Sequence, residues 1–157
     1  MTYSGNIDWK APLADEWDFN GEFFAGRNLD AYMAGIGQGV NTGVTQGAAT
    51  YSAALDKPID SVGGWSQLCY KPVRLPAWKF SVGIGIDDPD NADLSGSINK
   101  SRNLIYFGNG IWSLSEKTQI GVELSYMITD YMRTPYSSVP GSDGESIRLQ
   151  GMLQYSF

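Results

Sequence analysis

Four carboxylates lie close together in the segment "IDDPDNAD": Asp87, Asp88, Asp90 and Asp93. Clustered carboxylate oxygens are the ligands that a hard cation such as calcium prefers. The segment does not fit the calcium loop of an EF-hand, because the glycine and the distant glutamate of that loop are missing. We therefore expect this segment to be a solvated acidic loop without a bound metal. A cation site formed by the four aspartates is the alternative.

Acid–base and nucleophilic catalysis have few residues available in this chain. There is no histidine, which removes the commonest general base and the commonest metal ligand. Cys69 is the only cysteine, and without a flanking base we expect a small buried residue and no nucleophile. The segment "GIGQG" lacks the lysine and the hydroxyl residue of a phosphate-binding loop. These absences predict a protein that is not an enzyme and has no cofactor.

Isolated charges among polar and small residues form the second group that could carry function. Such a row can either line a water-filled space and select ions, or form cross-strand pairs that fill a narrow interior. The width of the enclosed space decides between these two alternatives. The candidate residues are Asp8, Asp18, Glu22, Arg27, Lys71, Lys79, Arg102, Glu123 and Arg148.

The elements that must position these charges have a period of two. Apolar residues alternate with polar or small ones, as in a strand with one apolar face. In the last segment, Ile147, Leu149, Leu153 and Tyr155 lie on one side and Arg148 on the other. About seven such strands are predicted, at residues 3–10, 17–25, 64–71, 78–87, 104–114, 119–129 and 145–157.

The connections between these segments alternate between short and long. The short ones are residues 11–16, 73–77 and 115–117, and the long ones are 27–63, 88–102 and 130–146. Pro12 is expected to end the first strand, because proline lacks a donor for the ladder. In an antiparallel meander every second connection lies at the same end, so all long loops should share one end. Whether the glycine-rich part of the longest loop, residues 35–47, folds inward or stays exposed is left open.

Composition excludes one class of partner and leaves two types of closed sheet. The net charge of −6 argues against nucleic acid, which needs a basic surface. Charged residues are 18% of the chain, too few for a dense polar coat. No apolar run reaches the roughly 20 residues of a spanning helix, and no leader peptide is visible after Met1. A soluble barrel would turn the apolar rows inward, whereas an outer-membrane barrel would turn them toward lipid.

Three features favour lipid. The row of side chains opposite the apolar row holds small residues, polar residues and isolated charged residues instead of dense lysine and glutamate. The predicted strand lengths match the roughly 9–11 residues of a tilted crossing. Aromatic residues lie near the ends of the apolar rows, as at a headgroup boundary. They are Tyr3, Trp9, Trp17, Tyr70, Trp78, Trp112, Tyr126 and Tyr155. The fold class predicted is therefore an all-β, antiparallel, up-and-down transmembrane barrel.

The ending "IRLQGMLQYSF", with "GEFFAGRNLDAYMAGIGQGVN" and "GGWSQLCYKP", resembles bacterial outer-membrane β-barrel proteins of the porin-like group, over nearly the whole chain. The resemblance implies passive diffusion of small hydrophilic solutes or ions across the bacterial outer membrane. It also implies contact with membrane lipid and lipopolysaccharide, to which a cation at the aspartate cluster could bridge. Tyr155 and Phe157 would form the signal read by the barrel-assembly machinery. A homotrimer is one oligomeric state that the resemblance suggests.

The odd number of strands departs from the family, because single-chain bacterial barrels have an even number. Either an N-terminal strand is missed or absent, or the chain is the C-terminal part of a larger barrel, which we expect. Two other functions remain as alternatives. One is a small structural or adhesive outer-membrane barrel that binds partners through its long loops. The other is a soluble β-barrel that carries a hydrophobic ligand.

Overall fold

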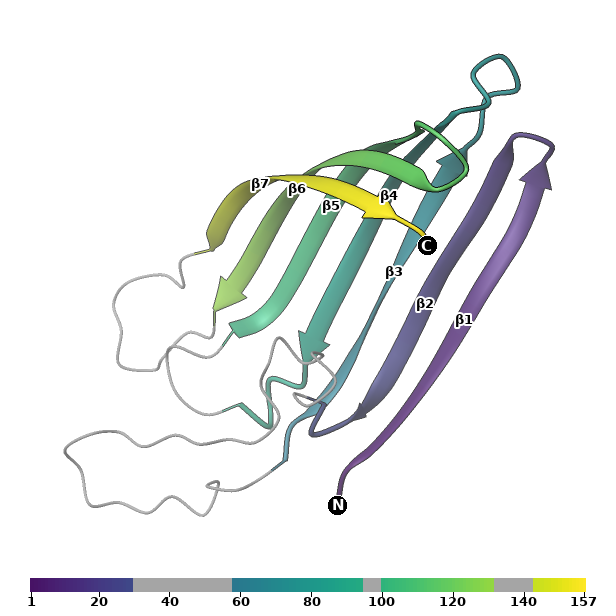
Figure 1. The fold of residues 1–157 in the computed structure, drawn as a ribbon. Helices are drawn as coiled ribbons and strands as arrows, with labels where there is room; N and C mark the ends of the chain where they lie inside the picture. Colours follow the sequence, from purple (N-terminus) through teal and green to yellow (C-terminus); the bar gives the residue numbers. More distant parts are fainter. Residues whose placement is uncertain (30–57, 95–99, 132–142) are drawn as a thin grey trace.

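The computed structural model describes residues 1–29, 58–94, 100–131 and 143–157. These residues form seven antiparallel strands (Figure 1). Their bounds are β1 Tyr3–Ala14, β2 Trp17–Arg27, β3 Asp60–Tyr70, β4 Trp78–Pro89, β5 Lys100–Ser113, β6 Thr118–Tyr131 and β7 Gly144–Tyr155. All seven predicted strands are therefore confirmed. The described residues contain no helix with the length and hydropathy of a membrane span.

The strands make one sheet in which each strand pairs only with its neighbours in the chain, in the order β1-β2-β3-β4-β5-β6-β7. The pairs Arg27↔Asp60 and Lys100↔Tyr131 lie at one end of the sheet. Residues 15–16, 71–77 and 114–117 connect strands at the opposite end. The predicted up-and-down order and the predicted separation of short and long connections are both confirmed.

Most strands are longer than their sequence patterns predict. Pro12 does not end β1; it pairs with Asp18, and a register shift follows between Pro12 and Ala14. This prediction was wrong because β1 is an edge strand, where a residue without an N–H costs no ladder hydrogen bond on the open side. At the other end of the sheet, β3 begins at Asp60 and β5 at Lys100, inside the predicted long loops.

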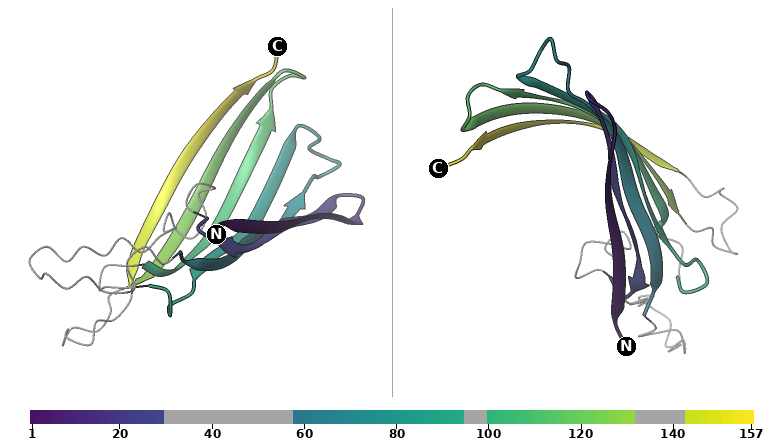
Figure 2. Two further views of the ribbon diagram at one scale, coloured as in Figure 1. Left: turned by 90° about the horizontal axis from the view of Figure 1, so that it is seen from below. Right: turned by 90° about the vertical axis from the view of Figure 1, so that its right-hand side faces the viewer.

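The sheet is strongly twisted and curved, and it is not closed. The side views show β1 to β3 turning away from the direction of β5 to β7 (Figure 2). No pairing joins β1 to β7 in the described residues. Because the number of strands is odd, β1 and β7 run in the same direction, so they could not complete an antiparallel ladder with each other.

Burial is inverted relative to an ordinary soluble sheet. The buried apolar side chains of the described part are Leu29, Ile59, Cys69 and Leu94. Large aliphatic side chains in the middle of strands are exposed instead, including Val82 at 62%, Leu124 at 56% and Leu149 at 72%. A soluble sheet gains most of its stability by burying such residues, and this sheet leaves them exposed.

Candidate functional site: the two faces of the sheet

The register assigns every strand residue to one of two faces, because residues directly opposite each other project on the same side. One row across the sheet runs through Phe19, Leu68, Val82, Gly108, Leu124 and Leu149. We call this side the apolar face. The adjacent row runs through Asn20, Gln67, Gly83, Phe107, Ser125 and Arg148. We call that side the polar face.

Seven of the predicted lining residues belong to the polar face or lie beside it. Asp8 and Glu22 pair directly across β1 and β2, and the Trp65 indole N–H donates to Glu22 Oε2 at 3.3 Å. Asn6 Nδ2 donates to Asp8 Oδ2 at 3.4 Å. Two carboxylates that face each other on adjacent strands repel, and these amide and indole donors offset part of that repulsion. The other polar-face members of the predicted set are Asp18, Lys71, Lys79, Glu123 and Arg148.

Two ion pairs on the polar face join neighbouring strands. Lys71 Nζ lies 2.6 Å from Asp18 Oδ2 at the end with the short connections, and this hydrogen bond raises the pKa of Lys71. Arg148 on β7 lies 3.7 Å from the Glu123 carboxylate on β6. Both pairs are partly exposed, and solvent screening leaves such pairs with little effect on stability. Their main effect is therefore to hold charges in fixed positions on this face.

Arg27 was predicted to line the same row, and its position is different. It pairs with Tyr3 and Asp60 in the register, which places it with the apolar face at the end of β2. Its Nε donates to Asp60 Oδ1 at 2.6 Å, and its guanidinium lies 5.9 Å from the ring centre of Tyr3. Counting alternate residues from Trp17 to Arg27 gives the correct face, so the pattern contained this information.

Two acidic partners and one amide were missed by the sequence analysis. Asp60 bonds Arg27, and Arg102 Nε donates to Asp130 Oδ2 at 2.7 Å at the same end of the sheet. Asn109 Nδ2 donates to Glu123 Oε2 at 3.4 Å. Asp60 and Asp130 were missed because they were assigned to loops. The cross-strand register is the signal that would have found them.

The four clustered aspartates are not brought together. Asp87 lies on the polar face opposite Asn103, whereas Asp88 lies on the apolar face opposite Val62. Asp93 is buried and accepts the backbone N–H of Asp60 at 3.1 Å, and Asp90 accepts the N–H of Ala92 at 2.9 Å. Within the described ranges no three acidic or cysteine side chains are grouped as a metal site. The alternation of side chains along β4 separates the first two carboxylates.

The polar face also carries large apolar side chains that lie over glycines of the next strand. Phe24 faces Gly63, and Phe107 faces Gly83. A Cβ atom added to either glycine would collide with the facing ring. The ring therefore lies flat against the sheet, an arrangement known to support glycine positions in strands. Small residues beside these rings, such as Ser81 and Ser125, become buried.

Cys69 belongs to this buried layer on the polar face. Its side chain is 1% exposed, and the Ser81 hydroxyl donates to its sulfur at 3.3 Å. The sulfur lies 3.9 Å from Asn20 Oδ1. The predicted burial of Cys69 is confirmed.

Aromatic rings gather on the apolar face at the end with the short connections. Trp17 stacks on Tyr70 with ring centres 4.5 Å apart. Trp78 stacks on Phe80 at 5.6 Å and on Trp112 at 5.7 Å, with rings nearly parallel in both contacts. Together these five residues form what we call the aromatic band. Its members come from β2, β3, β4 and β5, so the register aligns four strand ends into one band.

Two predicted features remain: the assembly signal at Tyr155 and Phe157, and the glycine-rich part of the longest connection. Tyr155 and Phe157 contact each other edge to face at 5.3 Å, and the Ser156 N–H donates to the carbonyl of Lys117 at 2.9 Å. Both aromatic side chains are exposed. The glycine-rich segment 35–47 lies outside the described residues.

Comparison with known proteins found no matching family model, no similar curated protein and no similar solved structure.

Proposed function

We propose that this sheet is part of the wall of an outer-membrane β-barrel that lets small hydrophilic solutes or ions diffuse passively. In this proposal the apolar face contacts lipid and the polar face lines water. No reaction is catalysed. The short connections lie on the periplasmic side and the long connections outside, as in the family that the sequence resembles.

The observation that carries the proposal is the exposure of aliphatic side chains along the whole apolar face. Ile7, Val82, Leu124 and Leu153 come from four different strands, and each is more than half exposed. A contiguous apolar surface of this extent is rare on soluble monomers. Membrane strands alternate in this way, with an apolar band facing lipid and polar residues facing the lumen.

The aromatic band supports the same orientation. Indole and phenol rings prefer the boundary between headgroups and hydrocarbon, where one edge is wet and the body is apolar. Strands of 11 to 14 residues are long enough for a tilted crossing, which needs roughly 9–11. A soluble ligand carrier would have its apolar rows inside a closed sheet.

Closure needs further strands beside β1 and β7. Lipid does not tolerate unpaired backbone groups at a sheet edge, because water is absent from the hydrocarbon region. An odd strand count prevents the two edges from pairing in antiparallel fashion. We therefore propose that this sheet is the C-terminal part of a larger barrel, whose remaining strands complete the lumen.

Thiol accessibility in lipid vesicles tests the orientation. In a Cys69→Ser background, Glu123→Cys and Leu124→Cys place thiols on neighbouring residues of β6 that face opposite ways. We expect a water-soluble maleimide to label Glu123→Cys and to leave Leu124→Cys unlabelled, while both react after denaturation in urea. Equal labelling of the two variants in vesicles would contradict the proposal.

Conductance across planar bilayers separates a channel from a structural barrel. We expect stepwise conductance from the complete barrel that contains this sheet, with ion selectivity that changes when Arg148→Glu reverses a charge on the polar face. A protein that inserts with the expected labelling but passes no current would fit the structural or adhesive alternative instead.

A further inference from the structure

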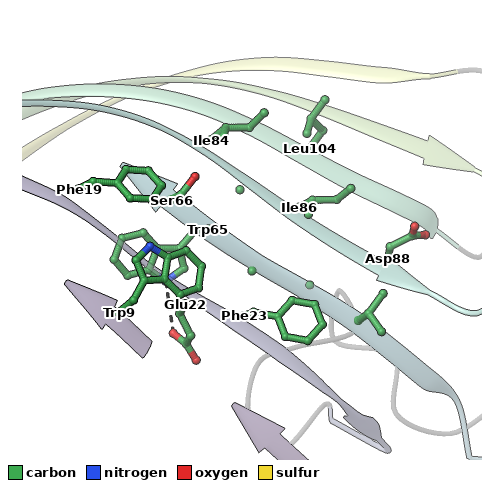
Figure 3. A pocket seen from close by; sticks show the side chains of 14 residues that line it. Trp9, Phe19, Glu22, Phe23, Trp65, Ser66, Ile84, Ile86, Asp88 and Leu104 are labelled. Atoms are coloured by element: carbon green, nitrogen blue, oxygen red, sulfur yellow. Dashed lines mark hydrogen bonds between the residues drawn. The ribbon is translucent and has the colours of Figure 1, made fainter. Parts of the chain in front are cut away.

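Two hollows of the described part lie on opposite faces of the sheet. The one on the apolar face has a volume of about 400 Å³ and is lined mainly by apolar side chains such as Phe23 and Ile86 (Figure 3). The proposed function turns it toward lipid, where a solute in water does not reach it. The other, of about 300 Å³, lies on the polar face over β5, β6 and β7. Its volume is at the lower end of the roughly 300–1,000 Å³ that small-molecule sites occupy.

A glycine forms the floor of the polar-face hollow. Gly121 on β6 pairs with Ile111 on β5 and with Met152 on β7, so a residue without a side chain lies between two large ones. A Cβ atom added to Gly121 would lie 3.2 Å from the methyl carbon of Met152 and 3.5 Å from Ile111 Cγ1. The two apolar side chains therefore form walls on either side of the glycine.

The next row of the register supplies polar groups to the hollow. Asn109 pairs with Glu123, which pairs with Gln150, directly beside the row of Gly121. Asn109 Nδ2 donates to Glu123 Oε2 at 3.4 Å, while Asn109 Oδ1 is buried and has no hydrogen-bond partner in the described residues. The Gln150 amide has no hydrogen-bond partner among them either. Because buried polar atoms are normally satisfied, a donor from outside the chain is expected here.

The charge at this hollow is balanced. Of the described residues that line it, Glu123 alone carries a charge. Arg148 on β7 lies 3.7 Å from the Glu123 carboxylate, so an ion of either sign meets one attractive and one repulsive charge. Lys79 pairs with Ile111 on the side away from Gly121 and does not line the hollow. The lining therefore offers hydrogen-bonding groups without an excess of charge.

We propose that this hollow is a binding subsite for a neutral, polyhydroxylated solute of about the size of a monosaccharide. The proposal rests on the proposed function, because the solute would reach the polar face through the water of the lumen. Such a solute carries C–H groups and hydroxyl groups on one small body. The C–H groups would lie against Ile111 and Met152. One hydroxyl would donate to the Glu123 carboxylate, and the Gln150 amide would donate to another.

Methyl NMR of the complete barrel that contains this sheet, in detergent micelles, tests the subsite. The methionine methyl groups are labelled with ¹³C, and the Met152 signal is identified by its loss in Met152→Leu. The probe is glucose, with glucosamine and glucuronate as cationic and anionic molecules that have the same ring. We expect glucose to shift the Met152 signal saturably and to leave the signal of Met127, which lies on the polar face outside the hollow, unchanged. Neither charged molecule should bind more tightly than glucose.

Two variants test the floor and the polar side separately. Gly121→Val places a side chain on the floor, and we expect the affinity for glucose to fall about tenfold because the solute loses that volume. Gly144→Val is the matched control, since it lies on the polar face at the other end of the same strand pair and its Cβ would make an ordinary contact with Tyr131.

Gln150→Ala removes the amide and should weaken glucose binding about fivefold, the ratio that one hydrogen bond is worth. Gln154→Ala is its control, on the same face of β7 and outside the hollow. Circular dichroism establishes that each variant is folded, and Gln150→Ala decides the outcome if Gly121→Val is not.

Three results would overturn the subsite. The first is a Met152 signal that glucose does not shift, and the second is equal affinity of wild type and folded Gly121→Val for glucose. The third is binding of glucosamine or glucuronate about tenfold more tightly than glucose, which would indicate an ion site. If Leu124→Cys is protected from labelling while glucose does not bind, only the subsite is wrong. Labelling of Leu124→Cys in vesicles would overturn the proposed function itself.

Discussion

At the scale of single residues, aromatic rings on the polar face cover glycines of the neighbouring strand. Gly83 on β4 lies opposite Phe107 on β5, on the polar face. A Cβ at Gly83 would collide with the Phe107 ring and would lie 2.6 Å from the backbone carbonyl of Ser66. The ring can move aside, but the carbonyl belongs to the neighbouring strand and cannot. The absence of a side chain at this position is therefore a packing requirement.

We predict that Gly83→Val destabilises the protein by about 1–3 kcal/mol, the usual cost of adding atoms to a packed contact. The measurement is the free energy of unfolding in urea, in detergent micelles. Gly5→Val is the matched control, since a Cβ at Gly5 meets no atom within 4 Å. It shares the entropic effect of replacing glycine in a strand, so the difference between the variants isolates the collision. Equal stability of the two variants would contradict the contact.

At the scale of elements, the register determines which strand ends meet in the aromatic band. Trp78 pairs with Trp112, and the register also places Trp17 opposite Tyr70. A shift of one residue would move every aromatic ring of a strand to the other face. The stacked rings therefore help to hold β4 and β5 in this register.

A double-mutant cycle on Trp78→Ala and Trp112→Ala measures that contribution. We expect a coupling free energy of about 0.5–1.5 kcal/mol, the range for aromatic pairs in this geometry. A cycle with Trp78→Ala and Trp65→Ala is the control, because Trp65 belongs to the polar face. Its coupling should be near zero. Coupling of the same size in both cycles would mean that the stack has no specific effect.

At the scale of the whole molecule, the distribution of apolar surface decides the environment of the sheet. β7 is suited to test this, because its residues are exposed on both faces. Leu149 and Leu153 project from the apolar face, while Gln150 and Gln154 project from the polar face. Two charges of the same sign can therefore be added to either face of one strand.

We predict that Leu149→Lys with Leu153→Lys strongly reduces insertion into lipid vesicles, measured by flotation. A lysine facing lipid costs about 2–4 kcal/mol at the bilayer midplane and less near the boundary. Gln150→Lys with Gln154→Lys adds the same charge toward the proposed lumen and should insert nearly as well as wild type. Equal loss of insertion in both double variants would mean that the apolar face does not contact lipid.

Much of the fold follows from the sequence alone. Alternation with a period of two is a local property of each segment, so the seven strands and the two rows of side chains could be predicted without knowing the neighbours. The order of the strands followed from the short connections, which allow only antiparallel neighbours. The ends of β1, β3 and β5 could not be predicted, because they depend on pairing with a partner strand and not on their own pattern.

Only the tertiary structure decided which side chains meet. The Arg27–Asp60 pair, the rings over Gly63 and Gly83, and the hollow over Gly121 each depend on the register between strands far apart in the sequence. It also separated Asp87 from Asp88, which the sequence presents as one acidic cluster. The physical reason is that a strand's own residues determine which of them share a face, whereas the backbone hydrogen bonds of its neighbours determine what lies beside each of them.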